Sequence, residues 1–188
     1  MKTNLFIFGL FISIAGFAQN NELLIQGHLI KFKNAKTYTL AIAEKLDANN
    51  YAFKPVKEEM SFNEQLVHIA DNIYWLSSTY IKEESNPVKG KKIIAKEMNK
   101  EQVIQFVSDA YEYGLKAMES LDEKTLTNSF NWSGGKMNKY QFLNLLQDHQ
   151  VHHVGKLIVY FRLNVIEPLK YRGRYNNSCV RKTPSEFD

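Results

Sequence analysis

Apolar residues recur at helical spacing in four long segments, and this repetition constrains the fold more than any other feature of the sequence. The segments cover residues 21–47, 61 to about 83, 99–121 and 138–163. Apolar residues spaced three or four positions apart form one face of a helix, which must be buried against another element. Few stretches show the strict alternation that is typical of strands. The sequence therefore predicts an all-α domain, a four-helix bundle.

Three of the four segments begin with a capping box. In this motif a polar residue before the helix and a Glu or Gln three positions later satisfy the first exposed amides. The pairs are Ser61 with Glu64, Asn99 with Gln102, and Asn138 with Gln141. Between the segments we expect a solvated loop over residues 84–96 and a polar connection over 127–138. The Gly134–Gly135 pair in that connection permits positive φ.

The start of the chain resembles a secretory signal peptide. Lys2 precedes an apolar run over residues 5–17, and Gly16 and Ala18 provide a small-residue cleavage site. The run is shorter than the roughly 20 apolar residues that cross a bilayer. A buried N-terminal helix is the weaker alternative, because no polar face interrupts the run. We expect cleavage near Ala18 and a periplasmic or secreted mature protein.

Removal of residues 1–18 would leave one bundle domain over 19–170 and an aperiodic tail over 171–188. Loss of Lys2 lowers the formal net charge from +4 to +3, which favours solubility and says little about partners. The single cysteine, Cys179, cannot form an intrachain disulfide, so an exported fold must rely on its core. No further segment suits a membrane anchor. The basic, aromatic tail sequence "KYRGRY" suggests nucleic-acid binding as a further function, but the expected export argues against it.

Two histidines interrupt the apolar stripe of the last segment. His149 and His153 are four residues apart, so their Cβ atoms lie about 5–6 Å apart on one helix face. Such a pair can bind one metal ion, and it can equally be a pair of core histidines satisfied by hydrogen bonds. The zinc-protease motif HExxH is excluded, because Gln150 stands where the general base would be. A third ligand is available in His68, at the edge of the apolar stripe of the second segment.

At these residues the sequence resembles the DinB-like (damage-inducible) superfamily of metal-binding four-helix bundles. "YTLAIAEKLDANNYAFKPVKEEMSFNEQLVHIADNIYWL" is similar to the family's first helix, linker and second helix with a central histidine. "HQVHHVGKLIVYFRLNVIEP" is similar to its C-terminal signature. The resemblance implies a metal triad of His68, His149 and His153. It also implies a divalent ion, zinc or nickel, and a tendency to form homodimers.

The resemblance also implies a class of activity, because some members of the family are metal-dependent transferases or isomerases that use low-molecular-weight thiols. The chain departs from the family pattern at Val154, where arginine is frequent, and at Lys156, where glutamine is frequent. These departures leave the triad intact, but they argue against assigning to this chain the substrate of any particular family member.

A site of three histidines leaves a coordination position open, as catalytic metal sites do. We therefore expect either an exported metal-dependent transferase or hydrolase acting on a small molecule, or a non-catalytic metal- or ligand-binding protein. Imidazole alone does not select the metal.

Other polar residues have two interpretations each. Glu64 and Asp71 lie within a helical turn of His68 and could serve as a base or as an acceptor beside the metal ligands. Their alternatives are the capping box for Glu64 and solvent for Asp71. His152 is expected at the periphery, His28 in a structural role, and Cys179 as an idle thiol.

Overall fold

The computed structural model describes residues 3–170, and their side chains from residue 22 onward. Four α-helices make up most of the fold: α1 (Thr3–Lys45), α2 (Phe62–Leu76), α3 (Lys100–Glu119) and α4 (Lys139–Leu163). A π-helical turn, Ser77–Lys82, extends α2. The predicted all-α four-helix bundle is confirmed.

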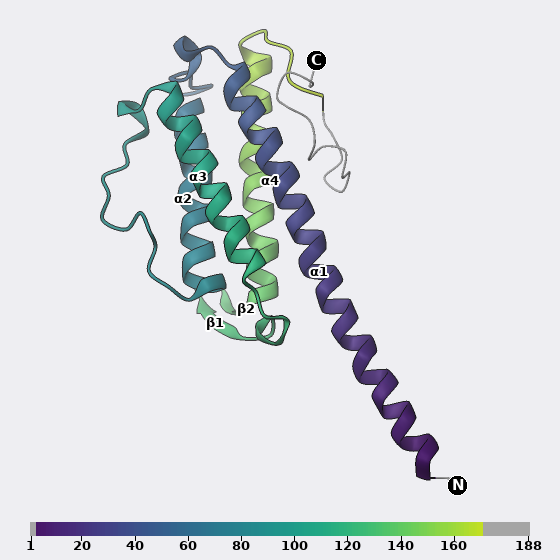
Figure 1. Cartoon of the computed structure of the whole chain (residues 1–188). Coiled ribbons are helices and arrows are strands. Elements are labelled where there is room, and N and C mark those ends of the chain that lie inside the picture. The colour runs from purple at the N-terminus through teal and green to yellow at the C-terminus, as the bar shows by residue number, and fades with distance from the viewer. Residues whose placement is uncertain (1–2, 171–188) are drawn as a thin grey trace.

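The helices pack side by side with α1 and α4 running in one direction and α2 and α3 in the other (Figure 1). Because α2 and α3 are parallel, the chain must return along the length of the bundle between them. It does so in the segment 83–99, which includes a 3-10 turn at Ala95–Glu97. Asn63 at the start of α2 holds this returning segment by donating to the Ala95 carbonyl at 2.9 Å. The crossover thereby covers one side of α2.

The capping boxes form as predicted at the starts of α2, α3 and α4. The first helix does not begin at residue 21, however. It starts at Thr3 and runs without a break to Lys45, so the predicted start was wrong. No proline interrupts the apolar run, so no residue in it prevents the helix from continuing. Figure 1 shows this first part of α1 extending away from the bundle.

A small hairpin replaces the irregular connection that was expected between α3 and α4. Strands β1 (Ser129–Trp132) and β2 (Gly135–Asn138) pair antiparallel, with Trp132 opposite Gly135. Gly135 has φ of +126°, as the glycine pair allowed. The hairpin is stabilised by aromatic contacts: the rings of Phe130 and Trp132 lie 6.1 and 5.5 Å from that of Phe142, centroid to centroid.

The core lies between the four helices, and side chains of α1 and α2 pack directly against Gly114 of α3. A Cβ at this position would lie 2.9 Å from the ring of Phe32 on α1 and 3.0 Å from Ile73 on α2. The absent side chain therefore lets three helices meet. The largest fully buried side chains are Tyr111, Phe32, Phe62, Phe142, Phe161, Ile42, Leu46, Leu66, Ile69, Ile73, Leu76 and Met118. Among the helices the structure describes, none has the length and apolar character needed to cross a bilayer.

Candidate metal centre

The fold brings His68 on α2 against His149 and His153 on α4. The Nε2 atoms of His68 and His149 lie 3.1 Å apart. The three ring centroids are 4.4 to 4.9 Å from one another. One nitrogen from each ring lies within 4.8 Å of the others, so the three histidines could hold a metal ion. Two residues adjacent on one helix and one from its antiparallel neighbour thus lie together, which is the grouping that the family resemblance implies.

The donor set fits a zinc-like ion. With metal–nitrogen bonds of 2.0–2.1 Å, tetrahedral geometry separates two ligand nitrogens by about 3.3 Å. The observed 3.1 Å between His68 and His149 is close to this separation. In addition, Nδ1 of His149 is buried with no hydrogen-bond partner among the described residues. The two rings are therefore spaced as metal ligands are. The one hydrogen bond between them leaves Nδ1 of His149 without a partner among the described residues.

Burial keeps these imidazoles neutral, which is the form that binds metal. Burial, with the neighbouring imidazoles, lowers the pKa of His149 to about 4 and that of His153 to about 3. Burial also lowers the pKa of His68, although Asp71 opposes the shift. A cluster that resists protonation at neutral pH presents lone pairs without first having to release protons.

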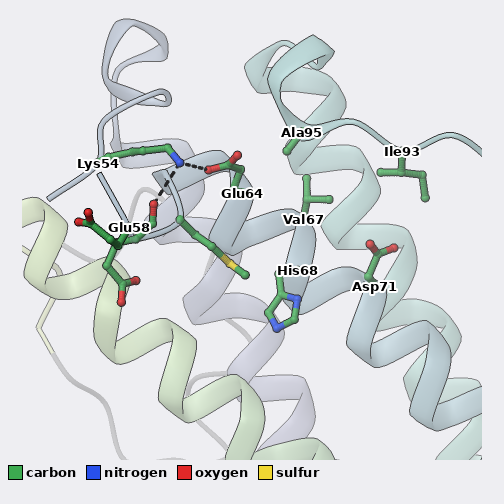
Figure 2. A pocket seen from close by; sticks show the side chains of 10 residues that line it. Lys54, Glu58, Glu64, Val67, His68, Asp71, Ile93 and Ala95 are labelled. Atoms are coloured by element: carbon green, nitrogen blue, oxygen red, sulfur yellow. Dashed lines mark hydrogen bonds and ion pairs between the residues drawn. The ribbon is translucent and has the colours of Figure 1, made fainter. Parts of the chain in front are cut away.

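A pocket of about 320 Å³ opens beside His68, the member of the triad that lies in its wall. Figure 2 shows its charged rim, where Lys54 forms an ion pair with Glu64 at 2.9 Å. On the α4 side, Lys156 forms an ion pair with Glu59 at 3.1 Å. The walls are Lys54, Glu58, Glu59, Met60, Glu64, Val67, His68, Asp71, Ile93 and Ala95. The pocket mixes apolar and charged groups at a size suited to a small molecule.

The two acidic residues near His68 differ in their surroundings. Glu64 accepts from the Ser61 amide at 2.7 Å in the capping box, as its structural interpretation predicted. That hydrogen bond, with Lys54, lowers the pKa of Glu64 to about 2, so this carboxylate is a poor base. Asp71 is half-buried in the pocket wall, and burial raises its pKa while His68 opposes the rise. Asp71 is therefore not simply in solvent.

The remaining histidines lie apart from the cluster or at its edge. His152 is exposed, although its ring contacts that of His153 at 4.9 Å. His28 is buried on α1, where its ring meets Tyr140 edge-on at 5.8 Å and its carbonyl accepts from Gln147. These positions fit the peripheral and structural roles expected. Cys179 lies outside the described residues.

Sequence reasoning missed Gln65 and Tyr160 as polar partners of the cluster. Gln65 Oε1 lies 2.5 Å from Nδ1 of His153, and Gln65 Nε2 lies 3.2 Å from the Tyr160 hydroxyl. Tyr160 is an aromatic residue whose ring is buried in the core, and nothing in the sequence indicates that its hydroxyl has a polar partner. A lone glutamine three residues before His68 gives no sequence signal of its own.

Replacing Glu64 by Gln keeps a residue that can complete the capping box, as Gln102 and Gln141 do, but removes the negative charge and the ion pair with Lys54. It is therefore expected to lower the free energy of unfolding at pH 7 by up to about 1 kcal/mol. Because folding lowers the pKa of Glu64 from 4.5 to about 2, the stabilisation is complete above pH 4.5 and disappears as the pH falls towards 2. Urea unfolding at pH 7 and at pH 3 measures this difference. Glu58→Gln, at an exposed carboxylate of the same pocket, is the control and should change little. A Glu64→Gln effect that is equal at both pH values would contradict the assignment.

Comparison with known proteins gives one consistent result. A sequence profile described as the DinB family matches residues 20–175. The chain is 25% identical over 148 residues to "Uncharacterized protein YjoA" of Bacillus subtilis (strain 168), which covers 77% of this chain and 90% of that protein. The crystal structure of this DinB-like YjoA has a TM-score of 0.64 at 22% identity, covering 79% of this chain and 96% of that one. A DinB-like protein from Bacillus cereus ATCC 10987 has a TM-score of 0.65 at 15% identity, covering 78% and 97%. The structural likenesses show the shared fold.

Proposed function

This chain belongs to the DinB family, and from that premise we propose that it binds a divalent metal ion through His68, His149 and His153 and acts with it on a small molecule. The observation that supports this most is the convergence of three neutral imidazoles, with ligand nitrogens within 4.8 Å, beside an open pocket. Zinc or nickel is the proposed ion, because the family resemblance implies one of the two and imidazole ligands suit both. A bound ion of this kind would act as a Lewis acid and would lower the pKa of a nucleophile.

The residues of the pocket suggest how a substrate would be held. The lysine of its wall, Lys54, is neutralised by Glu64, and the wall residue Glu59 is paired with Lys156 of α4. Asp71 remains in the wall with no hydrogen bond or ion pair to another described residue. A half-buried carboxylate with a raised pKa is suited to accept a proton from a substrate or to bind a donor group. We therefore propose Asp71 as the acidic group of the site.

The alternative is a non-catalytic protein that uses the metal to capture a ligand. The surroundings of the nearby glutamates favour it. Glu64 is held in its capping box, and Glu59 is engaged by Lys156 and by Gln65. Glu58 is exposed at the edge of the pocket, so Asp71 is the half-buried carboxylate of the described pocket that remains for acid–base work.

Export is a further part of the proposal. It is supported by Lys2, the apolar run over 5–17 and the small residues that follow it. Outside the cytoplasm low-molecular-weight thiols are scarce, so hydrolysis suits the compartment better than thiol transfer. Mass analysis of the N-terminus of exported material tests the cleavage near Ala18. A homodimer is likewise proposed, and sedimentation tests it.

Elemental analysis of protein purified without chelator is the decisive experiment. We expect about one equivalent of zinc or nickel per chain, because one triad offers one site. The loaded protein is then assayed with thiol-conjugation and ester substrates. Turnover that Asp71→Asn abolishes while metal content is retained supports the enzyme. Stoichiometric metal without turnover favours the ligand-binding alternative, and absence of metal at equilibrium with excess zinc would overturn both.

A further inference from the structure

A buried chain of hydrogen bonds leads from the backbone to His153. The Tyr160 hydroxyl lies 2.7 Å from the Met60 carbonyl oxygen. The Nε2 atom of Gln65 lies 3.2 Å from the same hydroxyl, and Oε1 of Gln65 lies 2.5 Å from Nδ1 of His153. Gln65 is fully buried, and Tyr160 and His153 are 2% and 7% exposed. Water therefore competes little for these groups, and each must be satisfied within the chain.

Only one arrangement of protons satisfies every member of this chain. A backbone carbonyl can only accept, so Tyr160 donates its single proton to Met60. The Tyr160 oxygen then accepts from the amide nitrogen of Gln65, which also approaches the Glu59 carboxylate at 3.4 Å. With its nitrogen so engaged, Gln65 must turn its carbonyl oxygen to His153. The group facing that oxygen has to be a donor.

We infer that Gln65 is a positioning residue that holds His153 in the tautomer protonated at Nδ1, which leaves the lone pair of Nε2 for a metal ion shared with His68 and His149. The inference rests on the proposed metal function for its biological meaning. Hydrogen bonds to the distal nitrogen of a ligating histidine fix the orientation and tautomer of the ring. His149 offers a contrast, because its Nδ1 has no partner among the described residues. His153 is thus the ligand that the fold prepares in advance.

The variant Gln65→Met tests the inference, because it keeps the length of the side chain and removes the amide. Its matched control is Gln147→Met, at a glutamine that is 3% exposed and donates to the His28 carbonyl, away from the triad. In metal-free protein at pH 8, ¹⁵N-detected NMR of the imidazoles should show His153 protonated at Nδ1 in the parent and in the control. In Gln65→Met it should shift towards the Nε2-protonated form that free imidazole side chains prefer.

Zinc titration supplies the second readout. Gln65→Met is expected to weaken zinc binding by about 10- to 100-fold, as loss of an outer partner of a ligating histidine does, while the control binds as the parent. Gln65→Glu, which restores an acceptor to Nδ1, should recover both the tautomer and the affinity. Should Gln65→Met fail to fold by circular dichroism, Tyr160→Phe takes its place: it removes the hydroxyl that orients the amide, and a partial shift of the tautomer is expected.

The outcomes separate the two proposals. If His153 in Gln65→Met stays protonated at Nδ1 and zinc binds as tightly as in the parent, the positioning role is overturned. If the parent itself binds no zinc, the metal function fails, and the NMR comparison still decides whether Gln65 sets the tautomer. Equal loss of affinity in Gln65→Met and Gln147→Met would show a general packing effect and would also overturn the role.

Discussion

Alanine at any one of His68, His149 or His153 is expected to weaken zinc binding by more than about 100-fold, because removing a ligand itself costs more than removing its outer partner. Two imidazoles would remain, and water would have to replace the third. The helices should survive, since the hydrophobic core is built from other side chains. Metal content by elemental analysis and helicity by circular dichroism, measured on the same samples, test both statements.

His28→Ala is the matched control. This histidine is as buried as His153, each being 7% exposed, but it contacts Tyr140 and Gln147 and none of the triad. Its loss should cost stability through the cavity it leaves and should leave zinc stoichiometry unchanged. If His68→Ala retains a full equivalent of zinc, or if His28→Ala loses it, then the triad is wrongly assigned and the histidines are structural.

The helices that the sequence predicted best are those with two independent signals. For α2, α3 and α4 the apolar period and a capping box agree, and the helices begin directly after Ser61, Asn99 and Asn138. For α1 only the apolar period was available, and the start was placed 18 residues too late, at 21 instead of Thr3. A run that is apolar on all sides has no period to read, so its conformation could not be inferred from amphipathicity.

The hairpin was missed for a different reason. Its strands are four residues each, too short for alternation to stand out from the polar residues around them. Tertiary contacts stabilise the hairpin. Phe130 and Trp132 pack on Phe142, and the ring centroid of Trp132 lies 5.4 Å from that of Trp75 on α2. A sequence pattern records neither partner. Local propensity was overridden by contacts with helices distant in the chain.

The candidate site, like the fold, could be predicted from the sequence only in part. Helical spacing alone puts His149 and His153 on one face, because residues four apart are neighbours. Joining them to His68 required the family resemblance, since nothing in the spacing says which face of α2 meets α4. Gln65 was not predictable, because its role depends on the hydroxyl of Tyr160, 95 residues later, and on the backbone of Met60.

Acid should destabilise the metal-free protein well before its carboxylates titrate. In the unfolded chain a histidine takes up its proton near pH 6.5, whereas folding lowers the pKa of His149 to about 4 and that of His153 to about 3. Between these limits the unfolded state binds more protons than the folded state, so the free energy of unfolding falls as the pH falls. The full stability contribution of the neutral imidazoles is present above about pH 6.5. Below pH 6.5, each such histidine lowers the free energy of unfolding by up to about 1.4 kcal/mol per pH unit, or by roughly 2 kcal/mol from pH 6 to pH 4.5.

Urea unfolding of the zinc-free protein at intervals from pH 7.5 to pH 4.5 measures this slope. His149→Leu is the informative variant, because it removes one titrating imidazole from the cluster while leaving the hydrogen bond between Gln65 and His153 in place. It should lower the slope of the free energy of unfolding against pH between pH 6 and pH 4.5. The expected decrease corresponds to the uptake of about one proton fewer on unfolding. His152→Leu is the control for placing a leucine on this part of α4, because His152 is exposed and contacts the triad only through the ring of His153. Identical slopes for the parent and His149→Leu would mean that His149 already accepts its proton in the folded state, and a cluster charged in that way would repel a metal ion instead of binding it.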